Sequence, residues 1–107
     1  MQSLPGPLLT CWPVITEAAW LLKKDPSKVE HLLELIGSLV QIVPIEGSET
    51  EAITSIMRRY RDLRPQLADA CLVHLAHREE IDTIFTLDRR DFSVYRTKGK
   101  RPFQIVP

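Results

Sequence analysis

Hydrophobic positions follow two spacings along the chain, and together they predict short strands separated by helices. Apolar residues three and four apart predict helices over residues 13 to about 24, 26–36, 48–60 and 66–79. Apolar or β-branched runs predict strands over residues 7–11, 39–45, 82–87 and 102–107. Strands that alternate with helices favour parallel pairing, so we expect a three-layer αβα domain with a mostly parallel central sheet.

Several residues indicate where the helices begin and end. Asp25 and Pro26 read as the N-cap and first residue of the second helix, and Gly37 is expected to end it. Ser48 and Glu51 have the spacing of a capping box at the start of the third helix.

The same spacing predicts which side chains face the core. The expected inward residues are Ile53, Ile56, Met57 and Tyr60 in the third helix and Leu67, Cys71, Leu72, Leu75 and Ala76 in the fourth. For Trp12 and Trp20 we expect packing in the core or at a subunit interface.

Composition narrows the class of protein without naming a function. The 107 residues suit one domain, 1–107, and 14 basic residues balance 14 acidic ones, so net charge gives no sign of a nucleic-acid partner. No apolar run approaches the length of about 20 residues that spans a bilayer. The first ten residues have no basic region followed by a long apolar core, so we do not expect a secretory signal. Cys11 and Cys71 both have apolar neighbours. Free buried thiols in a reducing cytoplasm are therefore favoured over a disulfide or a metal site.

Candidate chemistry begins with carboxylates beside apolar stripes. Glu17 shares one helix face with Val14 and Leu21, and Asp69 lies near the start of the fourth helix. Asp88 follows the strand "TIFTL", and Asp91 comes three residues later.

Each acid also has an ordinary structural explanation. Glu17 could be a boundary residue, Asp69 a favourable charge at a helix start, and Asp88 part of a turn. Sites in α/β folds nevertheless gather at helix starts and at the carboxyl ends of strands. Clustered carboxylates repel unless a cation separates them, and oxygen ligands select Mg²⁺ or Mn²⁺. Such an ion activates water and stabilises phosphoryl charge, so the acids predict metal-assisted hydrolysis of a phosphodiester.

Basic residues gather in two segments, "RRYRDLR" (58–64) and "RTKGKR" (96–101), and at Arg89 and Arg90. All of these could contact phosphates or simply be solvated. Arg89 and Arg90 adjoin the predicted site, which favours substrate binding for these two. His74 and His77 lack further ligands for zinc nearby in the sequence.

The stretch "ADACLVHLAHREEIDTIFTLDRRDFSVYR" resembles the carboxyl half of a PIN-domain ribonuclease of the VapC toxin type, and "TCWPVITEAAWLL" resembles the family segment that carries its second acid. The resemblance implies that Glu17, Asp69 and Asp88 hold the metal and that Asp91 assists indirectly. It also implies divalent-metal-dependent cleavage of RNA, a homodimer, and a small antitoxin that covers the acidic groove.

The sequence departs from the family pattern at its start. The family's first, central strand ends in an Asp, and no such strand is found before Leu8. We therefore expect an amino-terminally truncated PIN-like domain with a weakened metal site. A non-catalytic module that binds an antitoxin or RNA, and a plain α/β scaffold with surface acids, stay open as alternatives.

Overall fold

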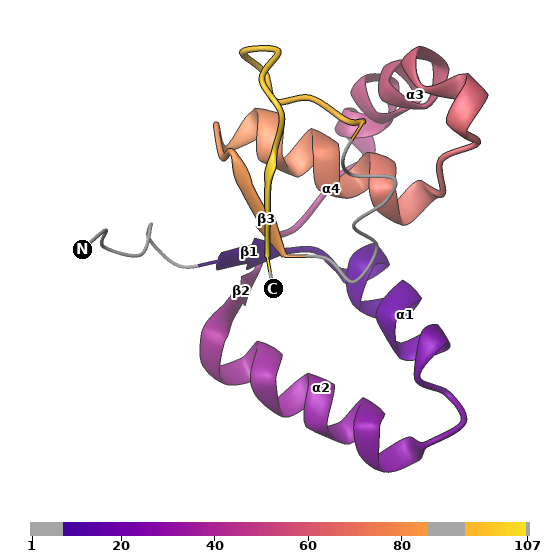
Figure 1. Cartoon of the computed structure of the whole chain (residues 1–107), viewed down its shortest axis with the longest axis vertical. Coiled ribbons are helices and arrows are strands. Elements are labelled where there is room, and N and C mark those ends of the chain that lie inside the picture. The colour runs from indigo at the N-terminus through magenta and orange to yellow at the C-terminus, as the bar shows by residue number, and fades with distance from the viewer. Residues whose placement is uncertain (1–7, 86–93, 107) are drawn as a thin grey trace.

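The computed structural model describes residues 8–85 and 94–106, and it has the expected alternation of strands and helices (Figure 1). In chain order the elements are β1 (Leu8–Thr10), α1 (Trp12–Leu21), α2 (Pro26–Leu39), β2 (Val40–Ile42), α3 (Thr50–Arg59), α4 (Leu67–Arg78), β3 (Thr83–Phe85) and β4 (Gln104–Val106). Short 3-10 turns cover Gly47–Glu49 and Arg61–Leu63. The α/β class predicted from the spacing is confirmed.

The strands are parallel but shorter than predicted, at three residues each. β1 pairs with β2 in the register Leu8 to Val40, and β3 pairs with β4 in the register Thr83 to Gln104. In the described part of the chain they form two two-stranded sheets rather than one continuous sheet, although β1 and β3 lie next to each other. The crossover α1–α2 joins β1 to β2, which is why this pair is parallel.

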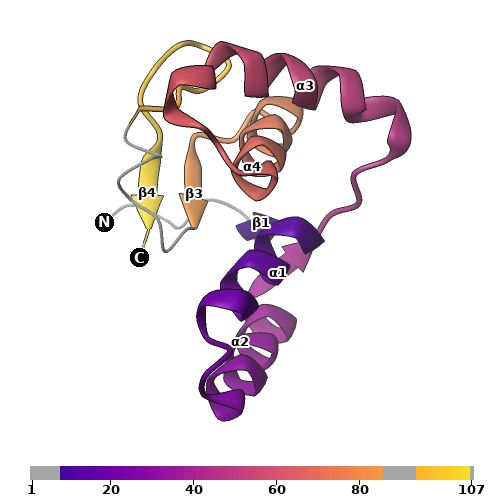
Figure 2. The same cartoon turned by 90° about the vertical axis from the view of Figure 1, so that its right-hand side faces the viewer.

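Helix α4 is the centre of the core because it packs against both α1 and α3 (Figure 2). Its residues Ala70, Val73 and Leu75 are almost completely buried. The predicted inward residues of α3 are confirmed, since Ile53 and Ile56 are buried and Met57 and Tyr60 pack against the same cluster. The predicted inward position of Leu67 is wrong, because this first residue of α4 is 60% exposed.

Two predicted helix boundaries are also wrong. Helix α2 begins at Pro26 with Asp25 as its N-cap, as predicted, but it continues through Gly37 to Leu39. Ending a helix at glycine requires a positive φ, and no described glycine has one. The capping box is formed by Glu46 and Glu49, two residues before the predicted pair.

Helices α1 and α2 project away from the α3–α4 part of the molecule (Figures 1 and 2). The buried residue of α1 is Ile15, whereas Trp12 and Trp20 are 58% and 63% exposed. The prediction that the two tryptophans pack in the core is therefore wrong, which leaves the subunit-interface alternative. No helix among the described residues is both long enough and apolar enough to cross a bilayer.

Candidate metal and active site

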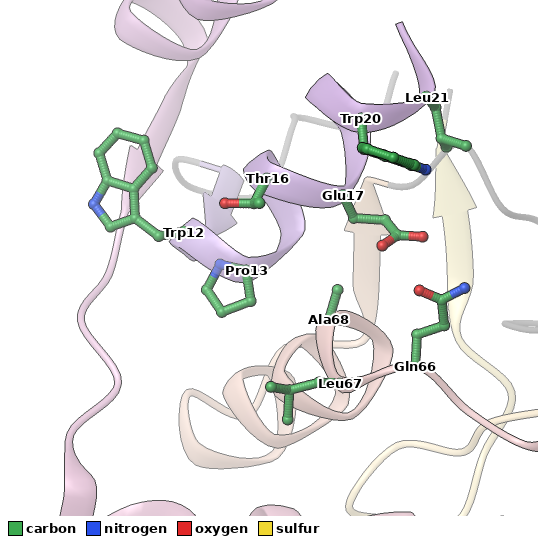
Figure 3. A pocket seen from close by; sticks show the side chains of 9 residues that line it. All are labelled: Trp12, Pro13, Thr16, Glu17, Trp20, Leu21, Gln66, Leu67 and Ala68. Carbon is green, nitrogen blue, oxygen red and sulfur yellow. The ribbon is translucent and has the colours of Figure 1, made fainter. Parts of the chain in front are cut away.

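Glu17 lies where α1 meets the start of α4. Helix α1 begins after Cys11, with Pro13 in its first turn where a missing N–H is tolerated. Buried Ile15 anchors one side of the helix. Glu17 is on a different side and points toward the amino-terminal turn of α4 (Figure 3). The carboxylate is partly buried between the two helices rather than inside the core.

Gln66, the N-cap residue of α4, holds the Glu17 carboxylate. With the Gln66 amide nitrogen facing Glu17, it donates to Oε1 at 3.0 Å and to Oε2 at 2.9 Å. Each carboxylate oxygen has two lone pairs, so this contact leaves acceptor capacity on both. The amide therefore orients Glu17 without excluding a further ligand.

A hollow of about 770 Å³ opens beside this carboxylate. Its walls come from the exposed side of α1 and the first turn of α4 (Figure 3). Trp20, Leu21 and Leu67 make most of the wall around Glu17 and Gln66 apolar. The helix face that carries Glu17 and Leu21 is thus the wall of a hollow, which explains a carboxylate on an apolar stripe.

Asp69 is the third residue of α4 and is only 9% exposed. Its position in the first turn places its negative charge near the positive end of the helix dipole. Gln66, which binds Glu17, lies one turn before Asp69 on the same helix. Asp69 therefore lies in the first turn of the helix whose N-cap residue contacts Glu17, although Asp69 does not line the hollow.

Four other predicted site residues, Asp88, Asp91, Arg89 and Arg90, lie outside the described residues. Among the described residues, no group of three or more His, Cys, Asp or Glu side chains is arranged to hold a metal ion. The predicted role of Asp88 as the third ligand therefore stays a prediction.

The donors at the α1–α4 junction fit a hard divalent cation better than a soft one. Glu17 and Asp69 offer carboxylate oxygens, the ligands that Mg²⁺ and Mn²⁺ prefer. Cys11 and Cys71 are free and buried, as predicted. Burial raises the pKa of Cys11 to about 11 and also raises the pKa of Cys71. Both thiols thus stay protonated at neutral pH, and a protonated thiol is a poor metal ligand.

Sequence reasoning did not identify Gln66 as part of this site. The sequence predicted only that Gln66 begins the fourth helix, three residues before Asp69, whereas in the structure it is the N-cap residue. Glutamine is not a favoured N-cap residue, and its side chain makes no capping hydrogen bond here. An N-cap side chain that does not cap its own helix is free to bind another element.

Comparison with known proteins places the chain in a family. The family model described as "PIN domain" matches residues 2–98. The chain is also 40% identical over 76 residues to a protein named Ribonuclease VapC26 from Mycobacterium tuberculosis (strain ATCC 25618 / H37Rv). The aligned stretch covers 71% of this chain and 56% of that relative, so the chain matches little more than half of the relative's length. Because the family model covers most of the sequence, the chain belongs to the PIN-domain family.

Proposed function

We propose that this chain is a divalent-metal-dependent endoribonuclease and the toxin component of a toxin–antitoxin pair. The observation that carries the proposal is the meeting of Glu17 with the first turn of α4, where Asp69 is nearly buried. Similarity to a protein named as a ribonuclease supports RNA as the substrate. Carboxylate oxygens are the ligands that Mg²⁺ and Mn²⁺ prefer, which supports a divalent metal at this end of α4.

The proposed roles follow the sequence interpretation. Glu17, Asp69 and Asp88 would hold Mg²⁺ or Mn²⁺, directly or through water, and Asp91 would orient a ligand or a water. Arg89 and Arg90 would contact substrate phosphates. When bound, the metal supplies an activated water and stabilises charge on the phosphoryl group. Gln66 keeps the Glu17 carboxylate oriented toward the α4 start.

Protein partners are part of the proposal. Apolar side chains surround the hollow beside Glu17, and a concentrated apolar surface commonly marks a protein interface. A second copy of the chain and a cognate antitoxin are the partners that family membership suggests. The two free, buried thiols support a cytoplasmic setting.

The proposal is tested with the full chain and a labelled RNA in the presence of Mg²⁺ or Mn²⁺. We expect cleavage, and we expect Glu17→Gln to lower its rate by at least about 10-fold, because loss of even a group that only supports a metal ligand costs about that much. Mn²⁺ should also raise the melting temperature of the parent chain more than that of Glu17→Gln, since a native-state ligand stabilises the fold. Glu30→Gln, on the exposed side of α2, is the matched control and should behave like the parent.

One observation favours a second candidate, a non-catalytic PIN-like module that binds an antitoxin or RNA. Gln66 donates to both oxygens of Glu17, so this carboxylate has a hydrogen-bonding partner even when no metal is bound. This candidate is correct if metal produces no thermal shift and RNA is bound but not cut. Cleavage that is equal in the parent and in Glu17→Gln would contradict the proposed site.

A further inference from the structure

Two basic segments that are distant in sequence meet on the side of α4 that faces α3. The segment 58–64 begins in the last turn of α3 and continues past its end, and the segment 96–101 lies just before β4. Tyr60 and Tyr95 join them, with ring centroids 4.7 Å apart in an edge-to-face arrangement. The backbone N–H of Arg96 also donates to Tyr60 Oη at 3.1 Å. Since Tyr95 is completely buried, this junction is part of the core rather than a loose surface contact.

The junction borders a hollow of about 400 Å³ with a basic lining. α3 contributes Ser55 and Arg59, α4 contributes His74, His77 and Arg78, and Lys98 comes from the loop before β4. No carboxylate is among the lining residues. The chain has no net charge, so this hollow is a local concentration of positive charge.

Among the described residues, only part of this positive charge is neutralised by carboxylates. Arg78 donates to Glu49 at 2.6 Å and to Glu79 at 2.9 Å, and His74 is bonded to Glu49 at 2.7 Å. Within residues 8–85 and 94–106, Arg59 and Lys98 form no salt bridge. With respect to the described residues, these two cations are therefore available to a ligand, beside His74 and Arg78, which Glu49 holds in place.

Helix dipoles provide a simpler explanation for some of these residues. Arg59 ends α3, and His77 and Arg78 lie in the last turn of α4, where positive charge is favourable. This explanation does not include Lys98, which lies in a loop. Arg59 and Lys98 both line the hollow, so one ligand in it can contact both of these cations.

We propose that this hollow binds backbone phosphates of single-stranded RNA, at a position separate from the acidic junction. Guanidinium and ammonium groups bind phosphate well, and the Ser55 hydroxyl is an additional donor. His77 lies eight residues after Asp69 on α4, which is about 12 Å along the helix axis. RNA that extends beyond the cut site could reach this distance. The inference rests on the proposed function, because that function supplies RNA as the ligand.

The test measures binding rather than cleavage. A fluorescein-labelled single-stranded RNA of mixed sequence is titrated with the full chain in EDTA, at several salt concentrations. We expect the double variant Arg59→Gln/Lys98→Gln to bind about 10-fold more weakly. The slope of log affinity against log salt should also become shallower by about 1.4, since each phosphate contact on a single strand contributes about 0.7.

The matched control is Lys24→Gln/Lys28→Gln, which removes the same charge near the α1–α2 connection and should retain the parent slope. An equal loss of RNA affinity in both double variants would overturn the proposal, because net charge alone would then explain RNA binding. A lower melting temperature with unchanged RNA binding would overturn it in favour of the helix-dipole explanation. Loss of binding to a poly-glutamate peptide, with RNA binding unchanged, would assign the hollow to an acidic protein segment and overturn it too.

Metal-free binding also separates this inference from the proposed cleavage. If RNA binds through Arg59 and Lys98 but is never cut, the proposed cleavage is refuted and RNA binding in the hollow is supported. If RNA is cut normally and the double variant binds it as well as the parent does, only RNA binding in the hollow is refuted.

Discussion

At the scale of single residues, the Glu49 carboxylate connects three parts of the chain. Glu49 Oε2 accepts from the backbone N–H of Glu46 at 2.8 Å. Its Oε1 is bonded to His74 Nε2 at 2.7 Å and to Arg78 Nη1 at 2.6 Å. These contacts join the start of α3 to the end of α4, and Arg78 extends them to the carbonyl of Pro44 at 3.0 Å. Together they lower the pKa of Glu49 from 4.5 to about 2, with the Glu46 N–H as the largest cause.

This lowered pKa predicts a pH-dependent contribution to stability. A carboxyl whose pKa is lower in the folded chain stabilises the fold fully above its unfolded pKa, near 4.5, and loses that contribution as the pH falls toward 2. Glu49→Gln should therefore melt at a lower temperature than the parent at pH 7, and the difference should shrink between pH 4.5 and 2. Circular dichroism melts across this range, with Glu30→Gln as the control, provide the measurement. If the difference in melting temperature between the parent and Glu49→Gln stayed constant down to pH 2, the lowered pKa of Glu49 would be contradicted.

At the scale of elements, α2 shows how a helix can continue through a residue that usually ends one. Its single buried residue is Ile36, and Gly37 follows on the exposed side. A Cβ placed on Gly37 meets no atom within 4 Å. Glycine at this position therefore has the entropic penalty of an interior helix residue without a packing reason for its presence.

Replacing this glycine should stabilise the chain. Gly37→Ala is expected to raise the free energy of unfolding by about 1 kcal/mol, since alanine has the higher helix propensity and restricts the unfolded chain. The urea midpoint of the unfolding curve measures the change. Gly47→Ala is a suitable control, because Gly47 also has open space around it but lies in a 3-10 turn at the start of α3, where helix propensity contributes less. A lower midpoint for Gly37→Ala would show that the glycine has a structural role.

At the scale of the whole molecule, the projecting α1–α2 part leaves several large apolar side chains exposed, which is unusual for such residues. Trp12, Trp20, Leu21 and Leu39 are each more than half exposed. The ammonium of Lys23 lies 3.1 Å from the centroid of the Trp20 ring and interacts with this side chain. Such surface is typical of a protein interface, in agreement with the subunit-interface alternative for the tryptophans.

A homodimer that uses this surface should depend on Trp20. The parent chain is expected to sediment as a dimer at micromolar concentration, and Trp20→Ser should shift the equilibrium toward monomer by about 10-fold or more, as loss of a buried aromatic anchor commonly does. Val94→Ser removes another exposed apolar side chain away from α1 and should leave the dimer intact. A parent chain that is monomeric by analytical ultracentrifugation would contradict the homodimer and direct attention to a different partner.

The sequence predicted the elements and the family better than it predicted the site. Apolar spacing identified the four α-helices and the four strands of the described residues because periodicity is a local property. The predicted core-facing residues of α3 were also correct. The capping box and the end of α2 were wrong because several local patterns there have similar energies. The convergence of Asp88 with Glu17 and Asp69 stays a prediction, since Asp88 lies outside the described residues.

The sequence by itself determined the α/β class, the PIN-type resemblance and the unusual position of Glu17, because each follows from the types and spacing of nearby residues. Only the tertiary structure showed that Gln66 holds Glu17, that the two tryptophans are exposed, and that Arg59 and Lys98 border one hollow. Those facts depend on contacts between segments far apart in the chain, and the packing of whole helices around α4 decides such contacts.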